Sequence, residues 1–111
     1  MINGVKNTAV LLDLQLGGGD TNLYPQVEIR NAVGTLLNTY NLTHIADGLY
    51  TYSWTISTEG YYSIVFKVYA DSGHTVLSED YDIGYETAKI DEYSLTDIKN
   101  AVQTVYNGME G

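Results

Sequence analysis

Apolar and polar residues alternate along several short segments between Thr8 and Tyr85, which is the pattern of half-buried β-strands. Pairs such as Asp47-Gly48 and Glu59-Gly60 separate these segments and predict reversals of the chain. Six or seven strands with turn signals about every 8–12 residues predict an all-β, antiparallel sandwich of the immunoglobulin-like kind. The expected strands are residues 8–16, 26–30, 35–42, 50–56 and 62–68, with a last one somewhere within residues 75–85.

Near the end of the chain the spacing of the apolar residues changes from two to three and four, so a short α-helix is expected there. Ser94 and Asp97 resemble the capping arrangement at a helix start, and Gly108 suits the left-handed exit. A helix this short needs a packing partner, either its own sandwich or another chain. The expected organisation is an N-terminal arm (1–7), the sandwich (8–85), a linker (86–93), the helix (94–107) and a tail (108–111). The apolar stripe of the helix consists of Leu95, Ile98, Val102, Val105 and Tyr106, at spacings of three and four.

Composition narrows the possible functions. The 111 residues include 11 tyrosines and no cysteine, which favours β-structure and excludes disulfides and thiolate metal sites. Fourteen acidic against five basic residues give a formal net charge of −9, so nucleic acid is not an expected partner. No apolar run reaches about 18 residues, and the first residues lack the pattern of a signal peptide. Neither a membrane span nor secretion is therefore expected.

Two strands that each begin with Gly-x-Tyr carry a family resemblance. Residues 48–50 and 59–62 are similar to the middle of immunoglobulin-like domains of the filamin and macroglobulin type. In such domains the tyrosine closes the end of the sandwich and its hydroxyl bonds back to a corner. With the segments 16–30, 31–36 and 68–75, the chain resembles an immunoglobulin-like module of tailed-bacteriophage virion proteins over roughly residues 8–85. This resemblance implies a structural role in a virion, as a decoration, adaptor or fibre-base protein, and brings no catalytic residue.

The sequence offers little for catalysis or for a cofactor. His44 and His74 lie 30 residues apart without the further ligands that zinc requires, so solvated loop positions are expected. The Gly17–Asp20 segment lacks the lysine and the following helix of a phosphate-binding loop, and no Gly-x-Ser-x-Gly motif occurs. We therefore expect a non-enzymatic protein without a cofactor. Weak calcium candidates are Asp71, Asp80 and Asp82, whose carboxylates suit a hard cation, although the EF-hand spacing is absent and carboxylates on an edge strand also deter edge-to-edge aggregation.

Two tyrosines and the helix stripe are the expected interface residues. Tyr61 and Tyr69 lie out of phase with the core positions, so they should point outward, onto a partner or under the terminal helix. The stripe either closes the monomer, or it assembles a homo-oligomer or docks the subunit on a larger particle. The leading expectation is a structural protein located in a phage virion, made in the host cytoplasm, that contacts other virion proteins. The alternative is a carbohydrate-binding module that uses Tyr61 and Tyr69 on a glycan.

Overall fold

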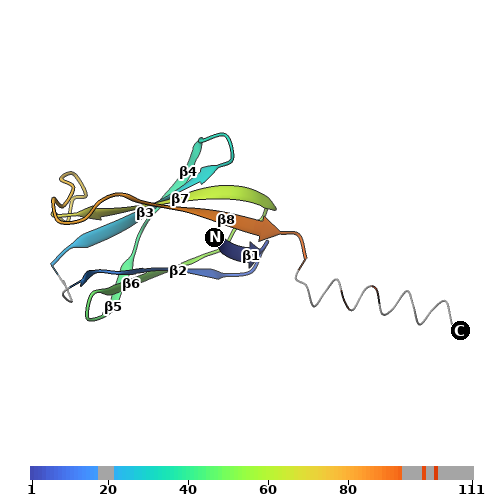
Figure 1. Ribbon diagram of the computed structural model, residues 1–111, viewed down its shortest axis with the longest axis horizontal. Helices are drawn as coiled ribbons and strands as arrows, with labels where there is room; N and C mark the ends of the chain where they lie inside the picture. Colours follow the sequence, from blue (N-terminus) through green and yellow to red (C-terminus); the bar gives the residue numbers. More distant parts are fainter. Residues whose placement is uncertain (18–21, 94–98, 100–101, 103–111) are drawn as a thin grey trace, which may run out of the picture.

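The computed structural model describes residues 1–17, 22–93, 99 and 102, and within them eight β-strands form two layers (Figure 1). The larger sheet, sheet A, has the strand order β1-β8-β7-β3-β4, and sheet B has the order β2-β6-β5. Consecutive strands pair in three places (β3 with β4, β5 with β6 and β7 with β8), whereas β1 with β8, β2 with β6 and β3 with β7 join strands that are distant in sequence, as in a Greek-key sandwich. The strands are β1 (Ile2–Val5), β2 (Val10–Gln15), β3 (Tyr24–Asn31), β4 (Leu36–Asn41), β5 (Thr43–Ala46), β6 (Leu49–Trp54), β7 (Gly60–Tyr69) and β8 (Gly84–Asp91).

The inner faces of the two sheets enclose the core. Trp54 packs edge-to-face on Tyr62, with their ring centroids 5.6 Å apart. The alternation in the sequence explains this packing, because inward positions of β2, β3, β6 and β7 carry the large apolar side chains. A second cluster fills the opposite end of the sandwich around Tyr50 and Val68. The fully buried side chains of the main cluster include Leu12, Val27, Ile29, Ile64, Ala88 and Ile90.

The expected all-β sandwich is confirmed, and its topology is immunoglobulin-like. The three strands of sheet B pair antiparallel, as do β3, β4, β7 and β8 of sheet A. One pairing departs from the expected antiparallel pattern, because β1 runs parallel to β8. After β1 the chain crosses from sheet A into sheet B, where β2 begins. Gly4 permits the close approach there, since a Cβ on it would lie 2.5 Å from Cγ2 of Val10.

Three of the expected boundaries are wrong in the structure. The N-terminal arm contains a strand, β1, because Ile2 packs on the core and its backbone pairs with Ala88. The linker expected over 86–93 is mostly β8, whose small and charged residues hide its alternation. The strand expected within 75–85 is a loop that contains an isolated bridge between Tyr69 and Leu77, before β8 begins at Gly84. The expected helix and tail lie outside the described residues, apart from Lys99 and Val102.

The Gly-x-Tyr pattern has the role expected from the resemblance. At the start of β7, the Tyr62 hydroxyl donates a 2.7 Å hydrogen bond to the carbonyl oxygen of Thr58. Burial raises the pKa of this phenol, so the hydroxyl keeps its proton at all physiological pH values. The equivalent hydroxyl of Tyr50 donates a longer hydrogen bond, 3.4 Å, to the carbonyl oxygen of Leu23. Each of these hydrogen bonds ties a buried tyrosine to the backbone of another segment.

Candidate interaction surfaces

The turn between β3 and β4 carries exposed apolar side chains on a hairpin that projects from the sandwich (Figure 1). The Asn31 carboxamide oxygen accepts hydrogen bonds from the amides of Val33 and Thr35, and Gly34 supplies the positive φ of 89° that the turn requires. Val33 at the tip is 86% exposed, and Leu36 and Leu37 follow it on β4. The turn is thus held by specific hydrogen bonds, and apolar residues are exposed on it and on the strand that follows.

Tyr61 extends this apolar region onto β7. It is 53% exposed, as its phase predicted, and it lines a shallow hollow of about 250 Å³ together with Val33. Glu59 contributes the charge at the rim of the hollow. We call the group of Val33, Leu36, Leu37 and Tyr61 the hairpin surface.

The outer face of sheet A carries three of the five basic residues of this acidic chain. Arg30 donates to Oε1 of Glu28 at 3.0 Å, and Lys67 donates to Oε2 at 2.7 Å. These contacts lower the pKa of Glu28, chiefly through the hydrogen bond from Lys67, and raise the pKa of Lys67. Lys89, on β8, is 3.7 Å from the carboxylate of Asp91 on the same face. This face therefore holds more positive charge than the rest of the molecule.

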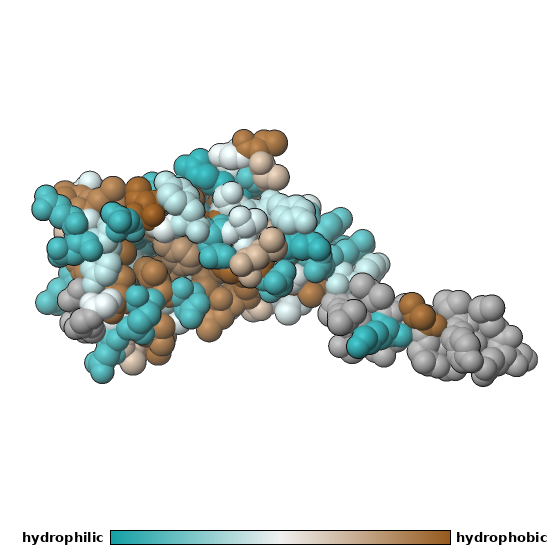
Figure 2. Space-filling model, viewed as in Figure 1, coloured by the Kyte–Doolittle hydropathy of each residue, from teal (hydrophilic) through white to brown (hydrophobic). Residues whose placement is uncertain are grey.

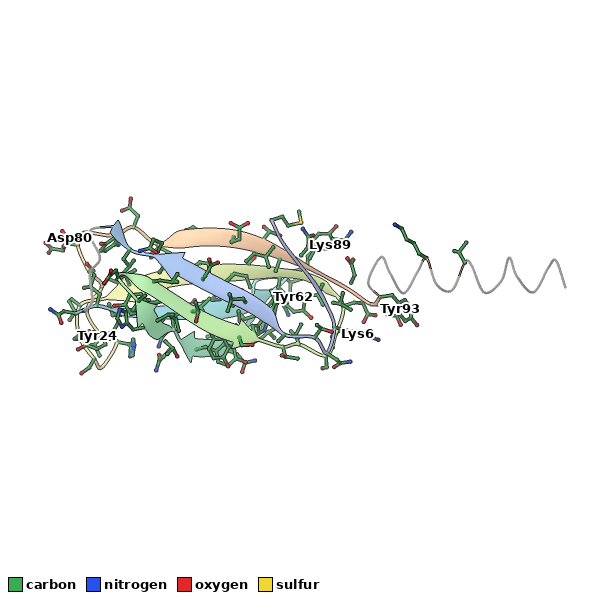
Figure 3. The ribbon with its side chains drawn as sticks, turned by 90° about the horizontal axis from the view of Figure 1, so that it is seen from below. Lys6, Tyr24, Tyr62, Asp80, Lys89 and Tyr93 are labelled. Carbon is green, nitrogen blue, oxygen red and sulfur yellow. The ribbon has the colours of Figure 1, made fainter. Side chains whose placement is uncertain are left out.

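Exposed tyrosines lie on the same outer face. Tyr85 is 75% exposed and pairs across the ladder with Val65, four positions along β7 from Tyr61. At the far end Tyr24 pairs with Tyr69, and both rings contact His74 edge-to-face at 6.2 and 5.4 Å. Tyr69 is thus outward-facing, as predicted, but it is half-buried under its own loop. Figure 3 shows Tyr24 and Asp80 at one end of the sandwich and Lys6 and Tyr93 at the other.

The Asp71 carboxylate, a calcium candidate, is hydrogen-bonded to other residues of its own loop. It accepts hydrogen bonds from the amides of Thr75 and Val76 and from the Thr75 hydroxyl. These donors, the Thr75 side chain first, lower the pKa of Asp71 to about 2. Asp80 and Asp82 are exposed in the loop that follows. Within residues 1–17 and 22–93, no three His, Cys, Asp or Glu side chains are grouped to hold a metal ion.

One side of the sandwich, between β2 and β8, is open. A hollow of about 310 Å³ lies there, floored by Leu14 of β2, by Leu16 directly after that strand and by Phe66 and Val68 of β7. Glu86 and its neighbours at the start of β8 form the rim. We call this hollow the side groove.

The remaining predicted residues are placed as follows. Val102 is 64% exposed, whereas Leu95, Ile98, Val105 and Tyr106 lie outside the described residues. His44 sits on strand β5 with its ring 5.1 Å from that of Tyr50, so it is a strand residue and not a loop residue.

Sequence reasoning missed the exposed leucines of β4 and the outward face of β8. Leu36 and Leu37 are adjacent, so one of them had to face away from the core, which was a signal available in the sequence. The sequence pattern places Tyr85 at the end of a strand and Glu86 in a linker. Their roles depend on β7 pairing with β8, a long-range contact that no local pattern encodes.

Comparison with known proteins supports the fold. No protein-family model and no curated protein sequence matches the chain. CopC from Methylosinus trichosporium has a TM-score of 0.56 and 22% identity, over 85% of this chain and 88% of CopC. A putative glycoside hydrolase from Bacteroides vulgatus has a TM-score of 0.51 and 10% identity, over 81% of this chain and 16% of the hydrolase.

A third solved structure is the CARDB domain of a Pyrococcus furiosus protein in complex with di-metal ions. Its TM-score is 0.47 with 23% identity, over 83% of this chain and 86% of that domain. In the part of the chain that the structure describes, no helix has the length and apolar character of a membrane span. The chain is a small β-sandwich domain, immunoglobulin-like in the general sense.

Proposed function

We propose that the protein is a non-enzymatic structural component of a phage virion, as a capsid decoration, an adaptor or a fibre or tail component. It joins other virion proteins through protein–protein contacts and is located in the particle. The observation that carries the assembly role is the hairpin surface, where exposed apolar side chains of the β3–β4 turn and of β4 lie with the exposed Tyr61 of β7. The phage context rests on the sequence resemblance over residues 8–85.

Physical chemistry favours a protein partner for the hairpin surface. Apolar side chains exposed together on a soluble domain mark interaction sites, because covering them removes apolar area from water. The turn is held by the hydrogen bonds of Asn31 and by Arg30, whose guanidinium donates to the carbonyl oxygen of Gly34 at 3.0 Å. A partner therefore meets a preformed hairpin, and little conformational entropy is lost on docking. The net charge of −9 adds a salt-dependent attraction to basic partner surfaces.

The test is incorporation into particles. Particles purified from host cells that carry the gene should contain the chain, detected by mass spectrometry and by antibody labelling. The double variant Val33→Asp, Leu36→Asp should fold but be absent from particles. The matched control is Leu11→Asp, which adds a charge at an exposed leucine on the outer face of sheet B and should be incorporated normally. Absence of the wild-type chain from particles would refute the proposal.

Light scattering tests the expected homo-oligomer with the same proteins. A wild-type oligomer that the hairpin double variant converts to a folded monomer would assign self-assembly to this surface. A monomer at every concentration would restrict assembly to other virion proteins.

A second candidate function is glycan binding on the outer face of sheet A. The observation that favours it is the pair of exposed tyrosines, Tyr61 and Tyr85, four positions apart along two adjacent strands, or about 13 Å. Flat faces with exposed aromatic rings can stack on sugars, and the nearby Lys89 would favour an acidic one. Binding on a glycan array that is lost in both Tyr61→Ala and Tyr85→Ala would support this function. Binding unaffected by either change would exclude this face.

A further inference from the structure

β4 forms one edge of sheet A, between β3 and β5 in the chain. It pairs with β3, and no described strand lies beyond it in the sheet. Leu42, directly after β4, donates its N–H to the carbonyl oxygen of Pro25, so these two residues are a hydrogen-bonded pair of the antiparallel ladder. Because such pairs alternate, Tyr40 also directs its N–H and C=O groups toward β3, whereas Thr39 and Asn41 direct theirs away from it. The free edge therefore presents backbone donors and acceptors at Thr39 and Asn41.

β4 lacks the features with which proteins usually protect an exposed edge strand. Residues 31–46 are the longest part of the sequence without Asp, Glu, Lys or Arg, and β4 contains no proline. The register shift of the β3–β4 ladder falls before Asn38, so the strand pairs regularly from there to Asn41. Two other described edges are better protected, because β2 carries Asp13 and β5 has only four residues and a register shift. The edge of β4 can thus accept a further strand.

The charge of the chain favours a second copy of itself at this uncharged edge. Two copies each carry a formal net charge of −9, so they repel one another unless the surfaces in contact lack acidic groups. Glu28 lies opposite Thr39 in the ladder, but its carboxylate is already paired with Arg30 and Lys67. Figure 2 shows apolar atoms, in brown, at the tip of the projecting hairpin that leads into β4. Two copies can therefore meet along β4 without bringing unpaired carboxylates together.

The free backbone groups of β4 are also self-complementary. A two-fold axis through Tyr40, perpendicular to the sheet, would place Thr39 of one copy opposite Asn41 of the other, and the reverse. Each of these pairs would exchange two hydrogen bonds, which satisfies the free groups at both positions. The Tyr40 side chains of the two copies would face each other across the axis, beside the Tyr52 rings on which they stack at 4.3 Å. Aromatic residues directly opposed on neighbouring strands stabilise a sheet.

From these observations we infer that β4 pairs antiparallel with β4 of a second copy of this chain, about a two-fold axis at Tyr40. Sheet A then continues from one copy into the other, and the free edge of each copy is covered. The inference goes beyond the proposed function, because it concerns the pairing of two copies and not their place in a particle.

Light scattering and NMR hydrogen exchange on the purified full chain test the pairing. We expect a monomer–dimer equilibrium, measured up to about 1 mM because a short strand pair binds weakly. The amides of Thr39 and Asn41 should exchange more slowly as the dimer fraction rises, since their N–H groups become bonded. Asp13 is the internal control. Leu16 donates to the carbonyl oxygen of Gly48, so by the same alternation the N–H of Asp13 points away from β6, and it should exchange equally fast at every concentration.

Two double variants at exposed positions test the register. Thr39→Lys, Asn41→Lys places lysine opposite lysine across the axis and should weaken the dimer at least about fivefold. Thr39→Lys, Asn41→Glu places lysine opposite glutamate at the same positions and should dimerise about as strongly as the wild type. The matched control, Ser53→Lys, Thr87→Lys, adds two lysines at exposed positions of β6 and β8, away from β4, and should dimerise normally.

Three outcomes would overturn the inference. The first is a monomer at every concentration, and the second is a dimer in which the amides of Thr39 and Asn41 still exchange rapidly. The third is a lysine–lysine variant that dimerises like the wild type. The particle test replaces Val33 and Leu36 and leaves Thr39 and Asn41 unchanged. A chain that enters particles but never dimerises would therefore refute only the strand pairing, and a dimer that is absent from particles would refute only the virion role.

Discussion

The Tyr62 hydroxyl and the Thr58 carbonyl oxygen are 2.7 Å apart, and their hydrogen bond ties the start of β7 to the corner that precedes it. The same ring packs against Trp54 in the main core cluster. Tyr62 thus connects the turn to the core. Its neighbour Tyr61 points outward from the same strand and belongs to the hairpin surface. The corner is a characteristic feature of immunoglobulin-like sandwiches.

Replacing Tyr62 by phenylalanine should lower the free energy of unfolding by about 1 kcal/mol, because a buried hydrogen bond is lost while the ring still packs. Urea denaturation followed by tryptophan fluorescence measures the change. The control is Tyr61→Phe on the neighbouring exposed residue, for which we expect less than about 0.5 kcal/mol. Equal effects of the two substitutions would show that the corner hydrogen bond does not stabilise the fold.

Gly4→Ala should destabilise the protein by about 1–3 kcal/mol through overpacking. The added methyl group would lie 2.5 Å from Cγ2 of Val10 and 3.1 Å from Cδ1 of Ile90, so β1 would have to move. Hydrogen exchange should then be faster at the β1–β8 ladder than elsewhere. Gly17→Ala is the matched control, since no atom lies within 4 Å of its added Cβ. A Gly4→Ala protein as stable as the control would contradict the close crossing of β1 and β2.

Glu28→Gln should cost about 1–2 kcal/mol of stability, because two charge-assisted hydrogen bonds are weakened at a site that is partly buried. The folded-state pKa of Glu28 is depressed. Its stabilising contribution is therefore complete above the unfolded-state pKa and is lost as the pH falls through the folded-state value. The difference in melting temperature between wild type and Glu28→Gln should shrink on acidification. A difference that is constant with pH would show that the carboxylate charge is not responsible.

The Asp71 carboxyl should titrate with a midpoint near 2, below the ordinary value of 3.8, because loop donors hold its charged form. A depressed folded-state pKa means that the loop is stabilised above about pH 4 and loses this contribution between about pH 4 and 2. Carbon-detected NMR titration of the aspartate side chains measures the midpoint directly. A midpoint near 4 would mean that the loop bonds do not persist in solution. A shift caused by added calcium would return Asp71 to the candidate metal ligands.

The strands that could be predicted from the sequence are those whose alternation is uninterrupted. In β2, and in β7 from Tyr62 onward, every inward position is a large apolar residue, so the pattern alone predicts both the strand and its buried face. In β8 the inward positions include Gly84, Glu86 and Ala88, and the pattern is weak there although Ala88 is fully buried. β1 has only four residues and includes a glycine. These two strands form because they pair with each other and because β8 also pairs with β7, which is tertiary information.

The candidate surfaces also include features that the local sequence predicts and features that depend on tertiary structure. The outward position of Tyr61 follows from its phase on β7, so it could be predicted locally. The side groove depends on how far β1 extends along β8, and the apolar residues of β4 are exposed because their hairpin projects beyond the sandwich. Neither property is visible in the local sequence, since both arise from strand lengths and from the unequal numbers of strands in the two sheets.

The parallel pairing of β1 with β8 also determines how the domain carries mechanical load. In a parallel pair, the beginning of one strand and the end of the other lie at opposite ends of the ladder. Tension applied before Ile2 and after Asp91 therefore pulls the two strands along their axes in opposite directions. All the hydrogen bonds of the ladder share this shearing force and must break together, instead of opening one after another. A domain tied in this way resists extension when a force pulls these two points of the chain apart.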